Sequence, residues 1–205
     1  MALGDSYATL AELKARIGIG DTVDDTPLTN ALATASRGIE RHCNRQFNNT
    51  NAASTRVFEP GPSTAWLVRV DDFYTTTGLV VATDSGDDGT YETVWASSDY
   101  QLEPLNGVVD GESGWPFYRI RAVAGRYFPL CMRRASVQVT AQWGWTAVPA
   151  PVKEACLVAA EETFKLKDTP FGVAGYGEYG SIRVRDNPKI AGMLRPYRRD
   201  PVLVG

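Results

Sequence analysis

The hydrophobic periodicity of this chain changes twice along its length, and this change constrains the fold more than any other feature. Near both ends, apolar residues recur every three or four positions, which is the spacing of an amphipathic helix. Between about residue 55 and residue 145 they alternate with polar residues, as in antiparallel strands with one solvated face. The pattern predicts helices, then a sheet, then a return to helices.

The sequence predicts three main helices and one short helix. Thr9 and Glu12 form a capping box before the first helix, which Gly18 ends. The second helix starts at Thr26 and Pro27, and the Asn-rich stretch 48–51 stops it. The third helix opens at Pro149 and Pro151, and the short one starts at Asn187-Pro188 and ends near Pro196.

Apolar stripes indicate how these helices pack. The expected buried positions are Leu10, Leu13 and Ile17 in the first helix, Leu28, Leu32, Ala35, Ile39 and Cys43 in the second, and Val152, Ala155, Cys156, Ala159, Ala160 and Phe164 in the third. A single short helix cannot bury its stripe alone, so the three main helices are expected to form one bundle.

The middle of the chain is predicted to form five to seven short strands that close into a small sandwich or barrel. Residues 66–70, 118–122 and 137–143 alternate in polarity, and residues 79–83 and 91–95 flank an acidic turn as in a hairpin. The predicted fold class is therefore α+β: a small helical bundle with an inserted antiparallel β subdomain. The expected parts are a helical core (1–54 and 146–186), the β insertion (55–145) and a C-terminal docking arm (187–205).

Composition excludes several classes of protein. The 205 residues carry 21 Lys plus Arg and 24 Asp plus Glu, a net charge of −3, whereas wholesale nucleic-acid binders are basic. The longest uncharged stretch, 135–152, contains glutamines, a glycine and prolines, so no membrane span is expected. No secretory signal is visible at the start, and three widely spaced cysteines fit a reducing compartment.

No catalytic, cofactor or metal site is predicted. Residues 175–180 read G-x-G-x-x-G, but they follow a predicted helix and precede a strand, the reverse of a dinucleotide site. The acidic turn at Asp84, Asp87 and Asp88 lacks calcium-loop spacing, so a polar turn is expected. The single histidine, His42, has no partners spaced for zinc or for a Cys–His nucleophile.

Two other groups of residues are candidates for contacts. The aromatic side chains of the glycine-rich loop, Phe171, Tyr176 and Tyr179, are candidate anchors in a neighbouring subunit, because aromatic residues dominate interface hot spots. Arg37, Arg41 and Arg45 follow at helical spacing and are expected along one face. That row could be a solvated face, the lining of a channel or a DNA-binding surface.

Two blocks of residues carry a likeness to a known protein family. One block of the likeness comprises residues 7–19 (YATLAELKARIGI), Asp24-Asp25 and residues 35–47 (ASRGIERHCNRQF). The other comprises residues 148–156 (VPAPVKEAC), 168–175 (DTPFGVAG) and 187–199 (NPKIAGMLRPYRR). In these blocks the chain resembles the head-to-tail connector, or adaptor, proteins of tailed bacteriophages. Compact members of this family are nearly all helical, so the β insertion is a departure from its pattern.

The resemblance implies a structural role without catalysis. Such adaptors form a ring, commonly of twelve copies, beneath the portal in the virion neck. They bind the portal and the stopper or tail completion protein, and double-stranded DNA passes through transiently and without sequence specificity. Assembly would occur in the cytoplasm of the bacterial host, with no membrane partner and no cofactor.

A portal-docking arm is expected at the C-terminus, and its deletion is expected to leave the fold intact. Apolar anchors beside arginines suit a protein groove with an acidic rim. The residues of this arm are Leu194, Arg195, Pro196, Tyr197, Arg198 and Arg199.

Two other functions compete with the adaptor hypothesis. A DNA-binding module would use Arg37, Arg41 and Arg45, and its affinity would fall steeply with salt. A carbohydrate-binding virion protein would stack sugars on Trp95 or Trp115, two of the five tryptophans, which all lie in the β region.

Overall fold

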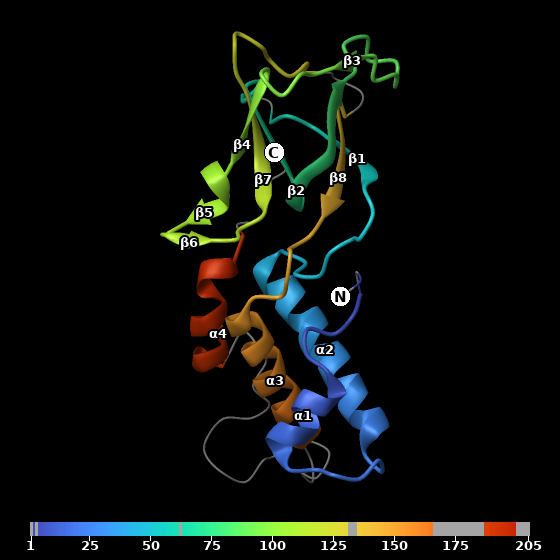
Figure 1. Cartoon of the computed structure of the whole chain (residues 1–205), viewed down its shortest axis with the longest axis vertical. Helices are drawn as coiled ribbons and strands as arrows, with labels where there is room; N and C mark the ends of the chain where they lie inside the picture. Colours follow the sequence, from blue (N-terminus) through green and yellow to red (C-terminus); the bar gives the residue numbers. More distant parts are fainter. Residues whose placement is uncertain (1, 3, 62, 131–134, 166–186, 200–205) are drawn as a thin grey trace. The chain divides into compact units, whose positions relative to one another are not determined.

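The computed structural model describes residue 2 and residues 4–61, 63–130, 135–165 and 187–199. The chain divides into two compact units, which we call the helical unit (3–48 and 147–205) and the β unit (49–146) (Figure 1). Helices and an antiparallel sheet thus occupy separate parts of the chain, which confirms the α+β class. The described part of the expected docking arm groups with the helices.

Helix α1 (Leu10–Ile17) begins and ends as the sequence predicts. The Thr9 hydroxyl accepts a hydrogen bond from the backbone N–H of Glu12 at 3.2 Å, and the Glu12 carboxylate accepts one from the N–H of Thr9 at 2.7 Å. This capping box satisfies two amide groups that have no partner within the helix. Gly18, at φ 74°, ends the helix in the left-handed conformation that favours glycine.

Helix α2 (Asp25–Cys43) buries the predicted stripe, from Leu28 to Cys43. Its ends differ from the prediction. The helix starts at Asp25 with Asp24 at the cap position, two residues before the expected cap Thr26. It ends at Cys43 because Asn44 takes the left-handed conformation, φ 51°, and donates its N–H to the Glu40 carbonyl.

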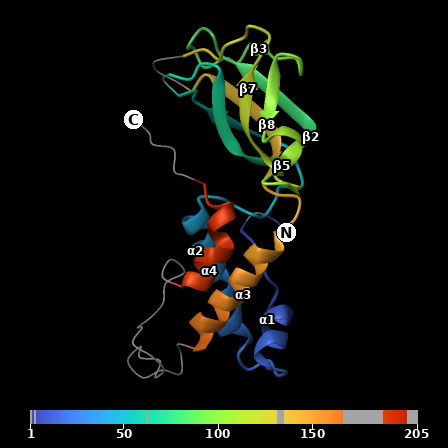
Figure 2. The same cartoon turned by 90° about the vertical axis from the view of Figure 1, so that its left-hand side faces the viewer.

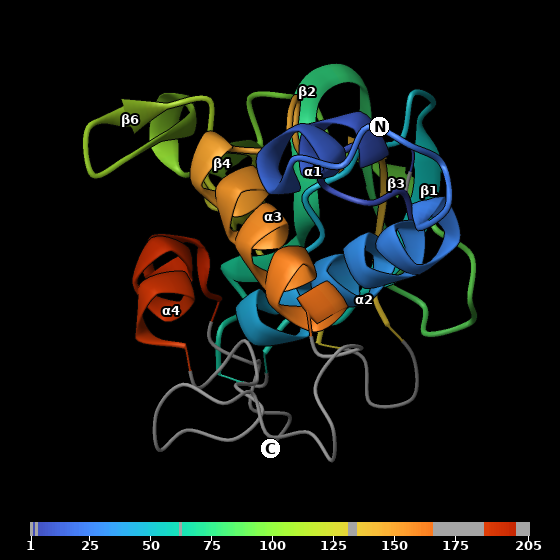
Figure 3. The ribbon, with the colours of Figure 1, turned by 90° about the horizontal axis from the view of Figure 1, so that it is seen from below.

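Helix α3 (Ala150–Lys165) is the centre of the helical unit. It buries all six predicted apolar positions and also Leu157 and Val158, so it is covered on more than one side. Helices α1, α2 and α4 (Pro188–Leu194) all pack against it (Figure 2). Seen along the bundle, α3 lies between α4 on one side and α1 and α2 on the other (Figure 3).

Ion pairs join α1 to α3 around this core. The Arg16 guanidinium contacts the carboxylates of Glu154 and Glu161, each at 2.8 Å. Lys153 pairs with Glu12 at 3.0 Å. Helix α4 is capped by the side chain of Asn187, as predicted, and the same side chain donates to Glu162 of α3 at 2.7 Å.

The β unit is built on one sheet in which a long strand bends. The sheet follows the order β1-β8-β2-β7-β4, and β3 pairs with β2. Its strands are β1 (Ser54–Phe58), β2 (Leu67–Thr83), β3 (Thr93–Val94), β4 (Tyr100–Glu103), β7 (Phe117–Ala122) and β8 (Val137–Trp143). A separate small hairpin pairs β5 (Val108–Val109) with β6 (Glu112–Ser113).

Strand β2 shapes this sheet. Residues 67–73 pair with β7 and residues 73–83 pair with β8, with register shifts between Arg69 and Val80. Such irregularities bend a strand, so the sheet curls around its own core. That core consists of Val68, Val70, Phe73, Val81, Trp95, Ile120, Phe128, Val137, Val139, Ala141 and Trp143.

The structure confirms the predicted hairpin, in which Ala82 pairs with Val94 and Thr83 with Thr93. The expected closure into a barrel or sandwich is wrong. Within the part of the chain that the structure describes, the strand order ends at β1 and β4, and these two strands do not pair. Among the described helices, none combines the length and the apolar character needed to span a membrane.

Candidate interaction surfaces

Three aromatic rings join the N-terminal segment, the end of α2 and the C-terminal segment of the helical unit. The Phe47 ring meets the Tyr7 ring edge-on at 5.6 Å and the Tyr197 ring at 5.9 Å. All three side chains are buried. We call this group the aromatic clasp.

Hydrogen bonds hold Tyr7 in the clasp. Its hydroxyl donates to Glu40 of α2 at 2.6 Å and accepts from the backbone N–H of Phe47 at 3.1 Å. Its own N–H donates to the buried hydroxyl of Ser36 at 3.0 Å. Burial raises the pKa of Tyr7, and the bond to Glu40 raises it further, so the hydroxyl stays protonated.

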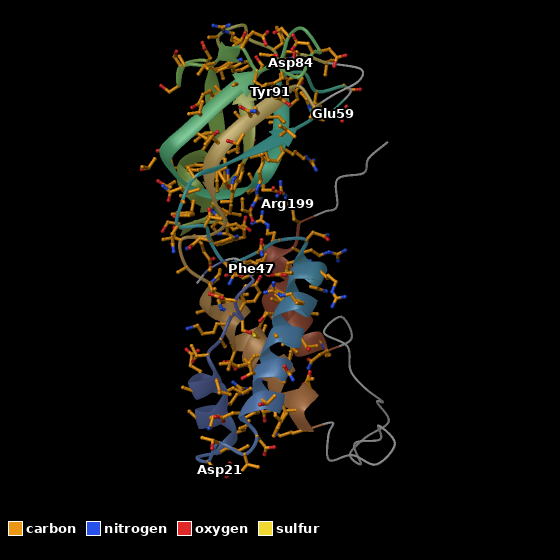
Figure 4. All side chains as sticks on the ribbon, turned by 90° about the vertical axis from the view of Figure 1, so that its right-hand side faces the viewer. Asp21, Phe47, Glu59, Asp84, Tyr91 and Arg199 are labelled. Atoms are coloured by element: carbon orange, nitrogen blue, oxygen red, sulfur yellow. The ribbon has the colours of Figure 1, made fainter. Side chains whose placement is uncertain are left out.

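The C-terminal segment is fixed to the same end of α2. The backbone N–H of Arg199 donates to the Cys43 carbonyl at 2.8 Å, and the Asn44 amide donates to the Arg199 carbonyl at 3.0 Å. Figure 4 shows Phe47 and Arg199 toward one end of the helical unit and Asp21 at the other.

The expected docking arm is therefore divided between the core and the surface. Leu194 and Tyr197 are buried within the helical unit, whereas Arg195, Pro196 and Arg198 are exposed and Arg199 is half-buried. The sequence pattern suggested apolar anchors that face a partner. In the structure these anchors instead complete the helical core, because α4 and the following turn pack against the unit's own helices.

The three arginines expected in one row do not form one. Arg37 pairs with Glu40 at 3.0 Å and donates to the Asp5 carbonyl at 3.0 Å. Arg41 is exposed. Arg45 lies beyond the helix end at Asn44 and is only 8% exposed. The reversal of the backbone at Asn44 is what removes Arg45 from the helix face.

Arg45 and Arg198, which belong to different predicted sets, both affect the charge of the Cys43 thiol. Burial raises the pKa of the Cys43 thiol to about 12, and the positive charges of Arg45 and Arg198 oppose that rise. Burial also lowers the pKa of His42, and Arg198 lowers it further.

The predicted aromatic loop and the candidate sugar-binding tryptophans are the remaining sites. Phe171, Tyr176 and Tyr179 lie outside the described residues. Trp95 and Trp115, the candidate sugar platforms, are 6% and 8% exposed. Trp95 stacks on Phe128 at 4.5 Å and Trp115 lies against Trp145 at 5.1 Å, so both rings are used within the protein.

The acidic turn between β2 and β3 is a hydrogen-bonded turn. The Asp84 carboxylate is buried and accepts from the N–H groups of Gly86 at 3.0 Å and Gly89 at 2.7 Å. Burial opposes ionisation of Asp84, but backbone donors from residues 86–89 outweigh it, so its pKa is lowered. The described residues contain no group of three or more His, Cys, Asp or Glu side chains suited to a metal ion.

The sequence pattern did not lead us to predict one surface of the β unit. Arg69 of β2 and Arg119 of β7 face each other across the strands, and Arg119 is opposite Glu103 of β4. Two residues further along β7, the Arg121 guanidinium lies 4.7 Å from the ring centre of the exposed Trp66. An uneven distribution of charge along the sequence could have indicated this surface. Residues 70–118 contain ten acidic residues and no Lys or Arg, whereas residues 119–134 contain five arginines and no acidic residue.

A comparison with models of known protein families matches the N-terminal part of the chain. The sequence model of the Phage gp6-like head-tail connector protein family matches residues 7–66, which include α1, α2, the Tyr7 and Phe47 parts of the clasp, and β1. The first block of the resemblance lies inside this range and the second lies outside it. No curated protein matches the chain.

Solved structures share the fold over the full length. A chain from "Neck of empty GTA particle computed with C6 symmetry" is 19% identical with a TM-score of 0.59, and the match covers 100% of this chain and 96% of that one. One from "Neck of native GTA particle computed with C12 symmetry" is 18% identical with a TM-score of 0.53, covering 100% and 99%. One from "Virion of native gene transfer agent (GTA) particle" is 18% identical with a TM-score of 0.52, covering 100% and 96%.

These findings confirm the resemblance to head-to-tail connectors and account for the β insertion, since the match to these chains includes it. Residues 7–66 match the gp6-like head-tail connector family of phages, and the chain as a whole has the fold of chains from gene transfer agent particles and their necks.

Proposed function

We propose that this protein is a structural adaptor in the neck of a tailed phage or phage-like particle, where a ring of its copies joins the portal to the tail. The observation that carries the proposal is the combination of a connector-family match at residues 7–66 with fold similarity to neck chains over the whole length. The adaptor catalyses no reaction, and its role is to bind other proteins.

The ring is proposed to contain twelve copies. The similar chains come from necks computed with C12 and C6 symmetry, which supports a cyclic assembly. A ring with more than two members needs two different surfaces on each subunit. The loop with Phe171, Tyr176 and Tyr179 is proposed as one contribution to the contact between subunits.

The portal-docking surface is proposed to be the exposed part of the C-terminal segment, chiefly Arg195 and Arg198. The aromatic clasp and the two hydrogen bonds at Arg199 hold this segment on α2, which reduces the conformational entropy lost on docking. An arginine guanidinium can form paired hydrogen bonds with a carboxylate, so these side chains suit a groove with carboxylates on its rim. A stopper or tail completion protein is the proposed partner on the opposite side of the ring.

Double-stranded DNA is proposed to pass through the ring with only transient contact. Arg37 and Arg41 remain candidates for the channel lining, while the burial of Arg45 leaves it little area for contact with phosphates. The net charge of −3 for each chain supports weak contact, because many cationic contacts would hold DNA tightly.

Electron cryo-microscopy of purified particles tests the proposal. A peptide tag on the chain is expected to appear as a ring of density between the portal and the tail, and counting the tags gives the number of copies. An untagged particle is the control. Tag density elsewhere in the particle, or none, would contradict the adaptor function.

A further inference from the structure

Two surfaces of the β unit carry exposed charges of mainly opposite sign. We call the residues Trp66, Arg69, Glu103, Arg119 and Arg121 the arginine face, and residues 84–92 the acidic turn. The face lies on the first half of β2 with β7 and β4, whereas the turn follows the end of β2. Among the described residues, no ion pair links the arginines of the face to the carboxylates of the turn.

The arginine face has more positive charge than its own acid can neutralise. Glu103 contacts Arg121 at 2.6 Å and Arg119 at 3.7 Å. Arg69 is exposed, lies directly opposite Arg119 and has no ion-pair partner among the described residues. Like charges placed opposite each other on adjacent strands are unfavourable, so an external carboxylate would stabilise this pair.

The face is also pre-arranged for binding. Arg121 is held between Glu103 and the Trp66 ring, and Arg119 lies over the Tyr118 ring at 5.1 Å. Guanidinium groups fixed in this way lose little side-chain entropy when they bind. An exposed tryptophan beside arginines is a composition enriched at protein–protein interfaces.

The acidic turn is rigid and presents carboxylates outward. Asp84 binds the N–H groups of Gly86 and Gly89, Glu92 accepts from the N–H of Ser85 at 3.2 Å, and Tyr91 donates to the Ala135 carbonyl at 2.8 Å. Asp88 and Glu92 are exposed and form no ion pair within the described residues. Asp84 and Tyr91 are labelled toward the same end of the β unit in Figure 4.

We propose that the arginine face of one copy binds the acidic turn of the next copy, so that the β units form a head-to-tail contact around the ring. The partner is thus a second copy of this chain, and the inference rests on the proposed function. Two complementary surfaces on one subunit are what a closed ring requires.

Nucleic acid fits the arginine face less well than a carboxylate-bearing protein does. Glu103 lies within the face and would repel phosphates. The β unit contains seven arginines, no lysine and eleven acidic residues. Eleven acidic residues against seven arginines give the β unit a net charge of −4, which opposes non-specific contact with the DNA backbone.

The substitution Arg69→Glu tests whether Arg69 acts in the contact between copies or only in the stability of the fold. It removes the like-charge pair with Arg119, so the melting temperature of the full chain is expected to stay the same or rise. In particles made with this variant in place of the native chain, the number of copies per neck is expected to fall about tenfold. Quantitative mass spectrometry against the portal protein measures that number.

The acidic turn supplies the reciprocal test. Asp88→Arg is expected to give the same loss of copies, and combining it with Arg69→Glu is expected to restore most of them. Asp88→Asn keeps the side-chain oxygen that accepts from Thr90 and removes only the charge, so an intermediate loss is expected. Glu112→Arg, a matched change of charge at another exposed position, is the control and should leave incorporation unchanged.

Distinct outcomes separate this inference from the proposed function. Normal incorporation of Arg69→Glu would overturn the contact while leaving the adaptor role intact. Loss with Arg69→Glu but not with Asp88→Arg would also overturn it and would indicate another anion, such as DNA, on the arginine face. Absence of the native chain from the neck would instead overturn the proposed function.

Discussion

At the scale of the residue, short hydrogen bonds from one side chain hold segments that are distant in the sequence. Tyr7 joins Glu40 and the backbone of Phe47, and Glu12 both caps α1 and pairs with Lys153 of α3. Each of these contacts can be removed by a nearly isosteric change, so each supports a direct measurement.

The first prediction concerns Tyr7→Phe. This change leaves the buried N–H of Phe47 without the hydroxyl that accepts its bond, and such a loss costs about 1–3 kcal/mol in the free energy of unfolding. Urea denaturation measures the difference. Tyr127→Phe, at a ring that is 67% exposed, is the matched control and should have no effect. Equal stability of the two variants would contradict the role given to the Tyr7 hydroxyl.

The second prediction concerns pH and Glu12. The Thr9 N–H, Lys153 and the Thr9 hydroxyl lower the pKa of Glu12 from 4.5 to about 2. Because the folded value is the lower one, the stabilisation is fully present above the unfolded pKa and is lost as the pH falls toward 2. Because glutamine keeps an acceptor oxygen and removes only the charge, Glu12→Gln is expected to cost about 0.5–1 kcal/mol at pH 7 and much less near pH 2. A cost that does not change with pH would argue against an ionised cap.

At the scale of the element, α4 and the turn after it are both part of the core and a candidate binding surface. Ile190, Leu194 and Tyr197 are buried, while Arg195 and Arg198 are exposed on the same segment. Deleting residues 187–205 is therefore expected to destabilise the helical unit, contrary to the expectation from sequence that the fold would stay intact.

The third prediction uses this division to test docking alone. Arg195→Glu with Arg198→Glu should leave the melting temperature nearly unchanged, because surface substitutions away from special features usually alter stability by less than about 0.5 kcal/mol. Binding to the portal is expected to fall at least about tenfold, measured by co-sedimentation with portal rings. Arg56→Glu in the β unit is a charge control. Undiminished binding of the double variant would remove these arginines from the docking surface.

At the scale of the whole molecule, ring assembly is expected to need contacts from both units. The fourth prediction is that Tyr176→Ala with Tyr179→Ala lowers the number of copies per neck, because large aromatic anchors contribute much of the energy at interfaces. Mass spectrometry of purified particles measures it. Phe171 and these tyrosines lie outside the described residues, so the proposal rests on their sequence. Unchanged copy number would exclude the loop as an anchor.

Sequence by itself determined several local elements and most of their buried faces. The Thr9–Glu12 box, the stripe from Leu28 to Cys43 and the strand alternation at 137–143 all follow from interactions within a few residues or from a period of 3.6 or 2. These features depend on neighbours along the chain, and the structure confirms them.

Only the tertiary structure decided which side chains remain available for partners. Asn44 reverses the backbone and buries Arg45, packing on the helices takes up Leu194 and Tyr197, and strand register brings Arg69 opposite Arg119. Each outcome depends on contacts between segments far apart in the sequence, and hydrophobic period carries no information about them. The surfaces of an assembly protein are therefore set by long-range packing, even where many of the helices and strands beneath them are locally encoded.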